Sequence, residues 1–599
     1  MIQYTIQAHD PKAHLFKVKL EIESPIQPIQ TLRLPNWIPG SYLIRDFAKN
    51  IVEIKAYTTT GAPIELSVID KSAWCFSSTE AVIIEYLVYA WDLSVRSAHF
   101  DETHGFFNGT STFLEVVNQS DLACRLNVVP SNITLANNWR VATGMPKVQV
   151  DEQGFGIYQA ENYTALIDYP VEMADFTEIC FTANGIPHKM VLTGQFDLDE
   201  ARLKNDLIKI CETELNLFGS PAPVEEYLFQ VMVTGSDYGG LEHRNSTALI
   251  CSRNDLPYPG MDEASDLYLQ FLELCSHEYF HTWNVKRIQP LVYQESDLQT
   301  PVYTNQLWWF EGVTSYYDCL ILLRAGIINY EKYLDLLAKQ MTRVYRMPGR
   351  FKQSVAESSW LTWTKFYQQN ENAPNAIISY YTKGSLLALA LDLMIRKQTQ
   401  NQQSLDHVLL HLWNEYGAKG IGLEDGEIER ICSIVTGIDF SLFFQDYLFS
   451  EKDLPFESLF ADFDIEFSLQ KPSCLDDPGG NTTKQVDPLP TFLGANVTPH
   501  ASGLKITHVW NEQSAYHAGL AAGDVIIALN HLKMDSKAKL EQLLKRSEAE
   551  RTIACHYFRR DEMRLTQITL QAPPIDRVAI SLQDGAQKHE HWLGQGLSK

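Results

Sequence analysis

The stretch CSHEYFHTWNV (275–285) decides the class of the central domain, because it places His277 and His281 four residues apart within a helical pattern of apolar residues. On an α-helix, such residues lie about 40° apart around the axis and about 6 Å apart along it. Two imidazoles in this arrangement can bind one metal ion, and Glu278 can face the same region without binding it. The stretch therefore predicts a helix that carries a metal site.

A histidine pair of this kind can also arise by chance in a chain with 17 histidines, so the assignment depends on a third ligand. Glu311, in WWFEGVTSYYD (308–318), is the candidate, with 29 residues between it and His281. A carboxylate among tryptophans is costly to bury unless it is paired or bound to a metal. The alternatives are a core helix with two hydrogen-bonded histidines, and a glutamate that interacts only with a helix dipole.

These residues together predict a catalytic Zn²⁺ held by His277, His281 and Glu311, with the fourth position left for water. Glu278 is then predicted to act as the general base on the zinc-bound water. A further carboxylate should orient one of the imidazoles, and both Asp318 and Glu273 are candidates for that role.

The composition narrows the class of protein. The 599 residues include 49 Lys and Arg against 74 Asp and Glu, a formal net charge of −25, which argues against a general partner of nucleic acids or anionic membranes. The ten cysteines form no CxxC pair and are typical of reduced thiols. The start of the chain shows no signal peptide, and the most apolar stretch, 385–395, contains Asp392. We expect a cytoplasmic protein.

The order of the patterns predicts a multidomain α+β protein, in which alternating strand patterns come first and helical patterns follow. A segment rich in Pro, Gly and Asp then separates a compact C-terminal unit. The predicted parts are an all-β domain (1–172), a catalytic domain (173–340), a helical domain (341–472), a linker (473–490), a C-terminal domain (491–575) and a tail (576–599).

HEYFHTWNVKRIQP (277–290) followed by WWFEGVTSYY (308–317) closely resembles the glycyl aminopeptidase family of zinc metallopeptidases, and PNWIPGSYLIRDF (35–47) resembles another signature of that family. The family is related to aminopeptidase N and has a thermolysin-like, gluzincin-type catalytic domain. The resemblance covers nearly the whole chain. Its implications are an aminopeptidase activity and a preference for a small first residue, Gly or Ala. The interval between His281 and Glu311 is longer than in aminopeptidase N.

The resemblance also implies roles for YGGLEHRNS (238–246), which is similar to the Gly-x-Met-Glu-Asn strand of aminopeptidase N. By this likeness Glu242 binds the free α-amine of a peptide, and the backbone at Gly239 and Gly240 lies alongside the peptide. A carboxylate at a fixed distance from the metal would select substrates with an ammonium group. Leu and His replace the Met and Asn of that pattern.

SYYTKGSLL (379–387) resembles the Tyr-x-Lys-Gly element of the same enzymes. The alignment on Lys383 and Gly384 selects Tyr381, rather than Tyr380, as the phenol that stabilises the oxyanion of the tetrahedral intermediate. On the residues alone, a Tyr-Tyr pair before a helix would be core packing.

AGLAAGDVIIALN (518–530) resembles a PDZ domain, in which LEQLL (540–544) lies on the helix beside the groove and TFLGANV (491–497) is the carboxylate-binding loop. The resemblance therefore implies a C-terminal peptide as a ligand of this groove. The alternative is a structural module whose groove is unused.

The combined prediction is a zinc-dependent aminopeptidase that acts on peptides with a free N-terminus and has no nucleic-acid or membrane partner. One alternative is a peptidase-like scaffold that binds peptides through its PDZ domain with little turnover. The intact Glu278 and Glu311 disfavour it. A second alternative is a thermolysin-like endopeptidase, which would have no use for an amine anchor at Glu242.

Overall fold

The computed structural model describes residues 1–481 and 487–593. The chain divides into two compact units, each described by itself below. Unit 1 comprises Met1–Val302 and Leu412–Glu424, and unit 2 comprises Tyr303–His411 and Asp425–Lys599. No helix in the described ranges has both the length and the apolar character needed to cross a bilayer.

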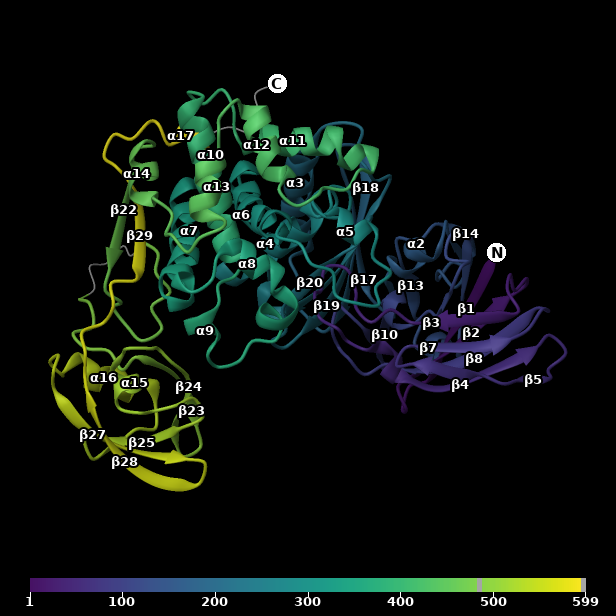
Figure 1. Cartoon of the computed structure of the whole chain (residues 1–599), viewed down its shortest axis with the longest axis horizontal. Helices are drawn as coiled ribbons and strands as arrows, with labels where there is room; N and C mark the ends of the chain where they lie inside the picture. The colour runs from purple at the N-terminus through teal and green to yellow at the C-terminus, as the bar shows by residue number, and fades with distance from the viewer. Residues whose placement is uncertain (482–486, 594–599) are drawn as a thin grey trace. The chain divides into compact units, whose positions relative to one another are not determined.

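Unit 1 begins with a large sheet whose strands follow the order β14-β15-β12-β1-β2-β8-β4-β5 (Figure 1). Along β2, buried and half-buried residues alternate, as the sequence pattern predicts for a strand with one face in the core. The strands of this sheet are β1 (Ile2–Asp10), β2 (Leu15–Ile22), β4 (Ile51–Thr58), β5 (Pro63–Ile64), β8 (Val82–Tyr89), β12 (Cys124–Val129), β14 (Lys147–Val150) and β15 (Gly156–Ala160).

Two smaller sheets complete this β domain, with the orders β13-β16-β10-β9 and β11-β3-β7-β6. Apolar side chains from all three sheets form one continuous core. The strands and helical segments are β3 (Ile29–Arg33), β6 (Ser67–Asp70), β7 (Ala73–Ser77), β9 (Ala98–Phe100), β10 (His104–Phe107), β11 (Glu115–Val116), β13 (Arg140–Ala142), β16 (Val171–Ala174), α1 (Asn132–Ala136), α2 (Tyr163–Ile167), η1 (Phe47–Asn50) and η2 (Gly109–Ser111).

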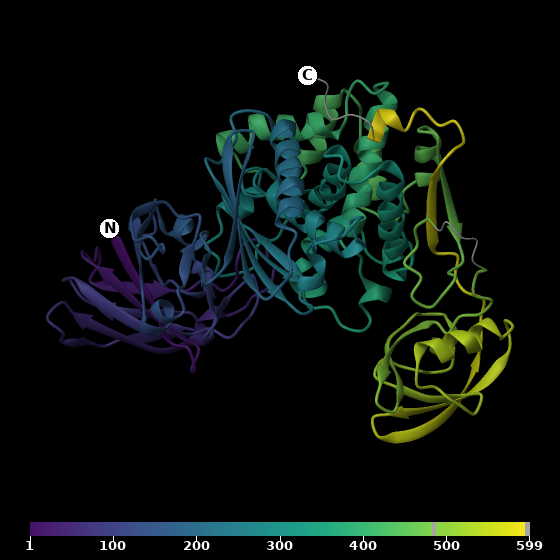
Figure 2. The ribbon, with the colours of Figure 1, turned by 180° about the vertical axis from the view of Figure 1, so that it is seen from behind.

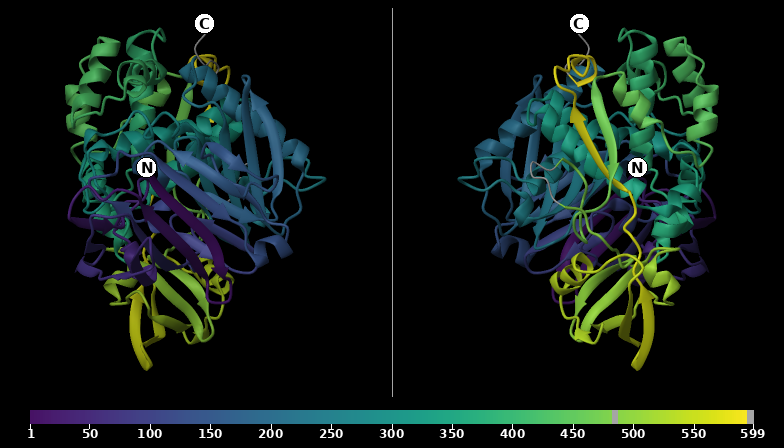
Figure 3. Two further views of the ribbon diagram at one scale, coloured as in Figure 1. Left: turned by 90° about the vertical axis from the view of Figure 1, so that its right-hand side faces the viewer. Right: turned by 90° about the vertical axis from the view of Figure 1, so that its left-hand side faces the viewer.

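The second part of unit 1 is a mixed sheet of order β17-β18-β19-β21-β20, whose strands run side by side in the left view of Figure 3. β18, β19 and β21 are mutually parallel, and β20 pairs antiparallel with β21 at one edge. The elements are β17 (Thr177–Ala183), β18 (Ile186–Gly194), β19 (Tyr227–Thr234), β20 (Gly239–Glu242), β21 (Ser246–Ser252), α3 (Glu200–Phe218), α4 (Asp266–Phe280), α5 (Leu291–Gln294), η3 (Arg253–Asp255) and η7 (Gly417–Lys419).

Helices dominate the first part of unit 2. The segment η4 (Trp308–Val313) is a π-helix that leads directly into α6 (Thr314–Arg324), and η6 (Thr362–Phe366) is a second π-helix. The other helical segments after Tyr303 are α7 (Tyr330–Tyr345), η5 (Pro348–Phe351), α8 (Val355–Trp360), α9 (Ala373–Ala376), α10 (Thr382–Gln398), α11 (Leu405–Glu415), α12 (Glu427–Thr436), α13 (Ser441–Tyr447) and α14 (Phe456–Ala461).

The rest of unit 2 contains a two-stranded sheet and a small β domain. β22 (Ile465–Gln470) pairs with β29 (Arg577–Leu582), which lies in the range expected as a tail (Figure 2). The small domain has the strand order β23-β24-β25-β27-β28, with β26 paired to β25. Its elements, with the last helix of the chain, are β23 (Ala495–His500), β24 (Gly503–Val509), β25 (Val525–Leu529), β26 (Leu532–Lys533), β27 (Thr552–Arg559), β28 (Glu562–Thr569), α15 (Ser514–His517), α16 (Lys537–Lys545) and α17 (Glu590–Leu593).

Candidate active site

The helix α4 carries the histidine pair. It begins after Ser265, whose side chain accepts a hydrogen bond from the Tyr268 amide at 3.1 Å, an ordinary N-cap. It ends at Phe280, so His281 is the C-cap residue. The ring centroids of His277 and His281 lie 4.6 Å apart, as expected for neighbours on one face of a helix.

The residues between the two histidines fix α4 to the sheet. Tyr279 is fully buried, its ring centroid lies 4.7 Å from that of Tyr227, and its hydroxyl lies 2.9 Å from Nε2 of His188. Burial lowers the pKa of His188 to about 4, so this imidazole is neutral at neutral pH and can accept the hydroxyl proton. The middle positions of the motif therefore hold the helix in place, while the histidines face elsewhere.

The orientation of His281 is set by a backbone group. Its Nδ1 lies 2.7 Å from the carbonyl oxygen of Asn284. Because a carbonyl can only accept, Nδ1 carries the proton and Nε2 keeps a lone pair for a metal. A tight turn after α4 places this carbonyl next to the imidazole. In the turn, the Lys286 amide donates to the His281 carbonyl at 3.1 Å, and Val285 has a φ of 126°.

The edge strand β20 places two features beside α4. A Cβ built on Gly240 would lie 2.5 Å from Cδ of Glu278, closer than real Cβ atoms approach, so any other residue at this position would displace the Glu278 side chain. Glu242 and Glu278 are 4 % and 5 % exposed, and a ligand atom of each lies within 4.8 Å of the other and of a ring nitrogen of His281. Two buried carboxylates this close repel one another unless a cation lies near them. The arrangement therefore suits a positively charged ligand.

Glu311 lies on the π-helix η4 and is 1 % exposed. His277 and His281 belong to unit 1 and Glu311 belongs to unit 2, and together they are the ligand set that the sequence predicts. Two imidazole nitrogens and one carboxylate oxygen are the donor set of a catalytic zinc site with an open fourth position. The residues present therefore fit Zn²⁺.

The segment around Tyr381 belongs to a close crossing of two helices in unit 2. A Cβ built on Gly312 would lie 2.7 Å from the carbonyl carbon of Gly384, so the backbones of η4 and α10 touch where each has a glycine. Tyr380 is fully buried and accepts a hydrogen bond from Thr362, whereas Tyr381 is half-buried. This difference favours Tyr381 over its neighbour as the phenol that faces a ligand.

In the small β domain, one amide of the expected carboxylate-binding loop is already engaged. The Phe492 amide donates to the Gln571 carbonyl at 2.9 Å, and Gly494 adopts a φ of 74°. The helix expected beside the groove is α16, which includes the LEQLL segment 540–544.

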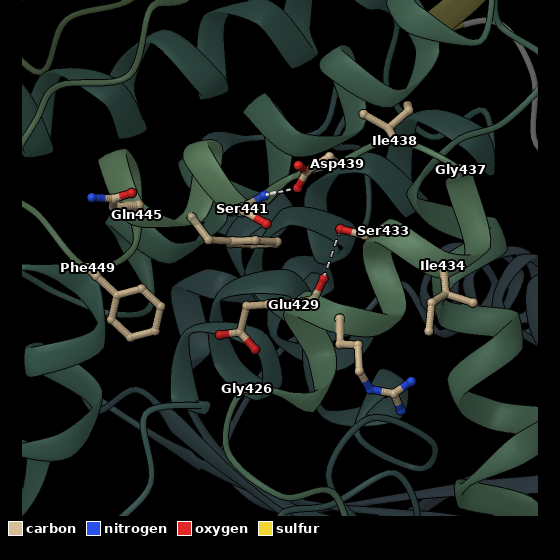
Figure 4. Close-up of a pocket in the computed structure, with 12 residues that line it drawn as sticks. Gly426, Glu429, Ser433, Ile434, Gly437, Ile438, Asp439, Ser441, Gln445 and Phe449 are labelled. Carbon is tan, nitrogen blue, oxygen red and sulfur yellow. Dashed lines mark hydrogen bonds between the residues drawn. The ribbon is translucent and has the colours of Figure 1, made fainter.

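A separate hollow lies between α12 and α13 (Figure 4). Apolar and polar side chains line it, among them Glu429, Ser433, Ile434, Asp439 and Phe449. None of the predicted site residues is among them, so this hollow is not the candidate active site.

Comparison with known proteins agrees with these observations. Family models match residues 3–175 (Peptidase M61 N-terminal domain), 270–387 (M61 glycyl aminopeptidase) and 491–570 (PDZ domain). The chain is similar to the crystal structure of an aminopeptidase N family protein from Idiomarina loihiensis, with 44 % identity, 99 % of this chain and 100 % of that chain covered, and a TM-score of 0.95. An M1 zinc metallopeptidase from Deinococcus radiodurans aligns at 10 % identity over 76 % of this chain and 95 % of that chain, with a TM-score of 0.49. No curated protein matches.

These findings confirm four predictions: the family resemblance, the multidomain fold with an N-terminal β domain and a C-terminal PDZ domain, the metallopeptidase class and the use of zinc. The chain belongs to the M61 glycyl aminopeptidase family and is a zinc metalloaminopeptidase.

Proposed function

We propose that this enzyme removes a small first residue, Gly or Ala, from peptides with a free N-terminus. The observation that supports this most is the group formed by Glu242, Glu278 and His281, whose ligand atoms lie within 4.8 Å of one another. One carboxylate beside an imidazole ligand is enough for a general base. A second buried carboxylate has a reason to be there if it binds the ammonium group of the substrate.

In the proposed reaction, Zn²⁺ held by His277, His281 and Glu311 supplies Lewis-acid polarisation of the scissile carbonyl and acidifies the attacking water. Glu278 accepts a proton from that water and later donates it to the departing amine, a contribution of about 10²–10⁴ in rate. Tyr381 donates a hydrogen bond to the oxyanion.

The substrate is held by its main chain and its amine. The backbone at Gly239 and Gly240 lies alongside the first peptide bond, and the Glu242 carboxylate binds the α-ammonium group. The Glu242 carboxylate lies at a fixed distance from Glu278. An ammonium group bound to Glu242 therefore places the first peptide bond, and no later one, beside the general base. A thermolysin-like endopeptidase would gain nothing from a buried carboxylate in this place.

The PDZ domain supports a peptide partner in addition to the substrate. A C-terminal peptide bound beside α16 is part of the proposal. In the scaffold alternative, peptide binding is the main activity and turnover is weak. That alternative predicts that loss of Glu278 would change the measured hydrolysis only slightly.

The test compares hydrolysis of Gly- and Ala-p-nitroanilide, with and without a chelator, by the wild type and three variants. Glu278→Gln is expected to keep its zinc and to lose about 10²–10⁴ in kcat. The N-acetylated forms of both substrates are assayed as well. Glu242→Ala is expected to raise KM for the free-amine substrates, so that the preference for them over the N-acetylated forms becomes smaller. Glu226→Ala, an exposed carboxylate just before β19, is the control. Full activity of Glu278→Gln would refute the general base, and equal losses on both substrate types would refute the anchor.

A further inference from the structure

The loop at residues 35–42 of the β domain contains a tight turn. The Ser41 amide donates to the Ile38 carbonyl at 3.0 Å, Pro39 occupies the second position of the turn, and Gly40 at the third has a φ of 86°. Proline followed by a residue of positive φ is the signature of a type II turn, which strongly favours glycine at the third position.

The turn is held rigidly against a later segment of unit 1. The indole nitrogen of Trp37 donates to the Thr300 carbonyl at 3.0 Å, and the Asn36 amide donates to the Leu298 carbonyl at 2.8 Å. Trp37 is 1 % exposed. At the other end of the turn, Arg45 donates to the Ser41 hydroxyl at 2.6 Å. The position of the turn is thus fixed from both sides.

Gly40 lies against the carboxylate of Glu242. A Cβ built on Gly40 would lie 2.6 Å from Oε1 and 2.8 Å from Cδ of Glu242, closer than real Cβ atoms approach. The carboxylate therefore occupies the space that any other residue at position 40 would need. Glu242 and this turn also line the same hollow, of about 530 Å³.

We propose that Gly40 is a positioning residue, which keeps the Glu242 carboxylate in the place where it can bind the amine of the substrate. The inference rests on the proposed role of Glu242 as the amine anchor. It gives a function to the Pro-Gly turn of the PNWIPGSY loop. The turn limits the carboxylate on one side, while α4 and β20 limit it on the others.

The chain offers a matched control. Gly61, in the turn between β4 and β5, has the same φ of 86°, and a Cβ built on it would meet nothing within 4 Å. Gly40→Ala and Gly61→Ala therefore place an alanine at the same φ, and only Gly40→Ala presses on Glu242. For Ala-p-nitroanilide we expect KM to rise about tenfold in Gly40→Ala with a smaller change in kcat, and to stay within about twofold of wild type in Gly61→Ala.

A double variant separates this contact from a general loss of stability. In Glu242→Ala the space beside Gly40 is vacated, so adding Gly40→Ala is expected to cause no further rise in KM. The extra drop in melting temperature of Gly40→Ala over Gly61→Ala should also disappear in that background. If Glu242→Ala raises KM but Gly40→Ala behaves like Gly61→Ala, the inference is wrong and the anchor stands. If Glu242→Ala leaves KM unchanged, both the positioning role of Gly40 and the anchor role of Glu242 are wrong.

Discussion

Replacing Gly312 by alanine should disable the enzyme through the crossing of η4 and α10. The new Cβ would lie 2.7 Å from the carbonyl carbon of Gly384 and 2.8 Å from the Tyr380 carbonyl oxygen, both of which are backbone atoms. Carbon atoms in good contact are about 3.5 Å apart, so the two helices must separate by about 0.8 Å. Overpacking of this kind costs about 1–3 kcal/mol.

The same displacement reaches the proposed metal ligand, because Glu311 immediately precedes Gly312. A zinc–carboxylate bond is only about 2.0–2.2 Å long, so a shift of this size weakens it. A misplacement of about 1 Å in an active site can cost about 100-fold in rate. We therefore expect kcat/KM of Gly312→Ala to fall by about 100-fold and its zinc to be lost to a competing chelator more readily.

Gly384→Ala tests the same crossing from the other helix. Its Cβ would lie 3.2 Å from Cα of Gly312, so a separation of only about 0.3 Å is needed. We expect a loss of kcat/KM below about tenfold. The assays are Ala-p-nitroanilide hydrolysis, zinc content by elemental analysis and thermal unfolding. Wild-type activity and zinc retention in Gly312→Ala, or equal losses in the two variants, would refute the reasoning.

Two further predictions concern buried groups of unit 2. Burial lowers the pKa of Lys383 from 10.5 to about 8, so the unfolded chain binds more protons between these values and the free energy of unfolding should rise with pH across this window. Lys383→Met should reduce this rise in the free energy of unfolding by up to about 3 kcal/mol between pH 8 and 10.5, as measured by denaturant titrations. A rise as large as that of the wild type would show that Lys383 does not cause it. Trp592 is fully buried and donates to the Tyr316 hydroxyl at 3.0 Å, so Trp592→Ala should cost about 3–5 kcal/mol. Trp360→Ala, at a 41 % exposed position, is the control and should lower the free energy of unfolding far less in the same assay. If Trp592→Ala lowered it no more than this control does, the C-terminal segment would not stabilise this unit.

The sequence predicted those parts of the site that depend on residue type and local spacing. The pair His277 and His281 follows from helical geometry, and Glu311 from the cost of burying a carboxylate among aromatic residues. The strand that carries Glu242 was predicted from its likeness to aminopeptidase N, and it lies at the sheet edge beside α4.

The parts that the sequence could not predict are those made by the backbone or by distant segments. The group 2.7 Å from Nδ1 of His281 is the carbonyl of Asn284, which every residue type possesses. The role of Asp318 or Glu273 in orienting the other imidazole, that of His277, stays a prediction. The helical pattern at 308–313 gave no sign of a π-helix, because the change from α to π adds one residue to a turn without altering the apolar periodicity visibly. The contact of Gly40 with Glu242 joins residues some 200 positions apart.

The edge position of β20 has a consequence for self-association. An open sheet edge can pair with any extended chain through main-chain groups alone, including a strand of a second copy of the same protein. β20 spans only four residues, Gly239–Glu242, and two of them are glycines. So short a strand, weakened by glycine, is a poor template for a lasting intermolecular sheet. A short edge therefore discourages aggregation through added strands, and it suits the proposed role of β20, which is to hold only the few residues at the end of a peptide.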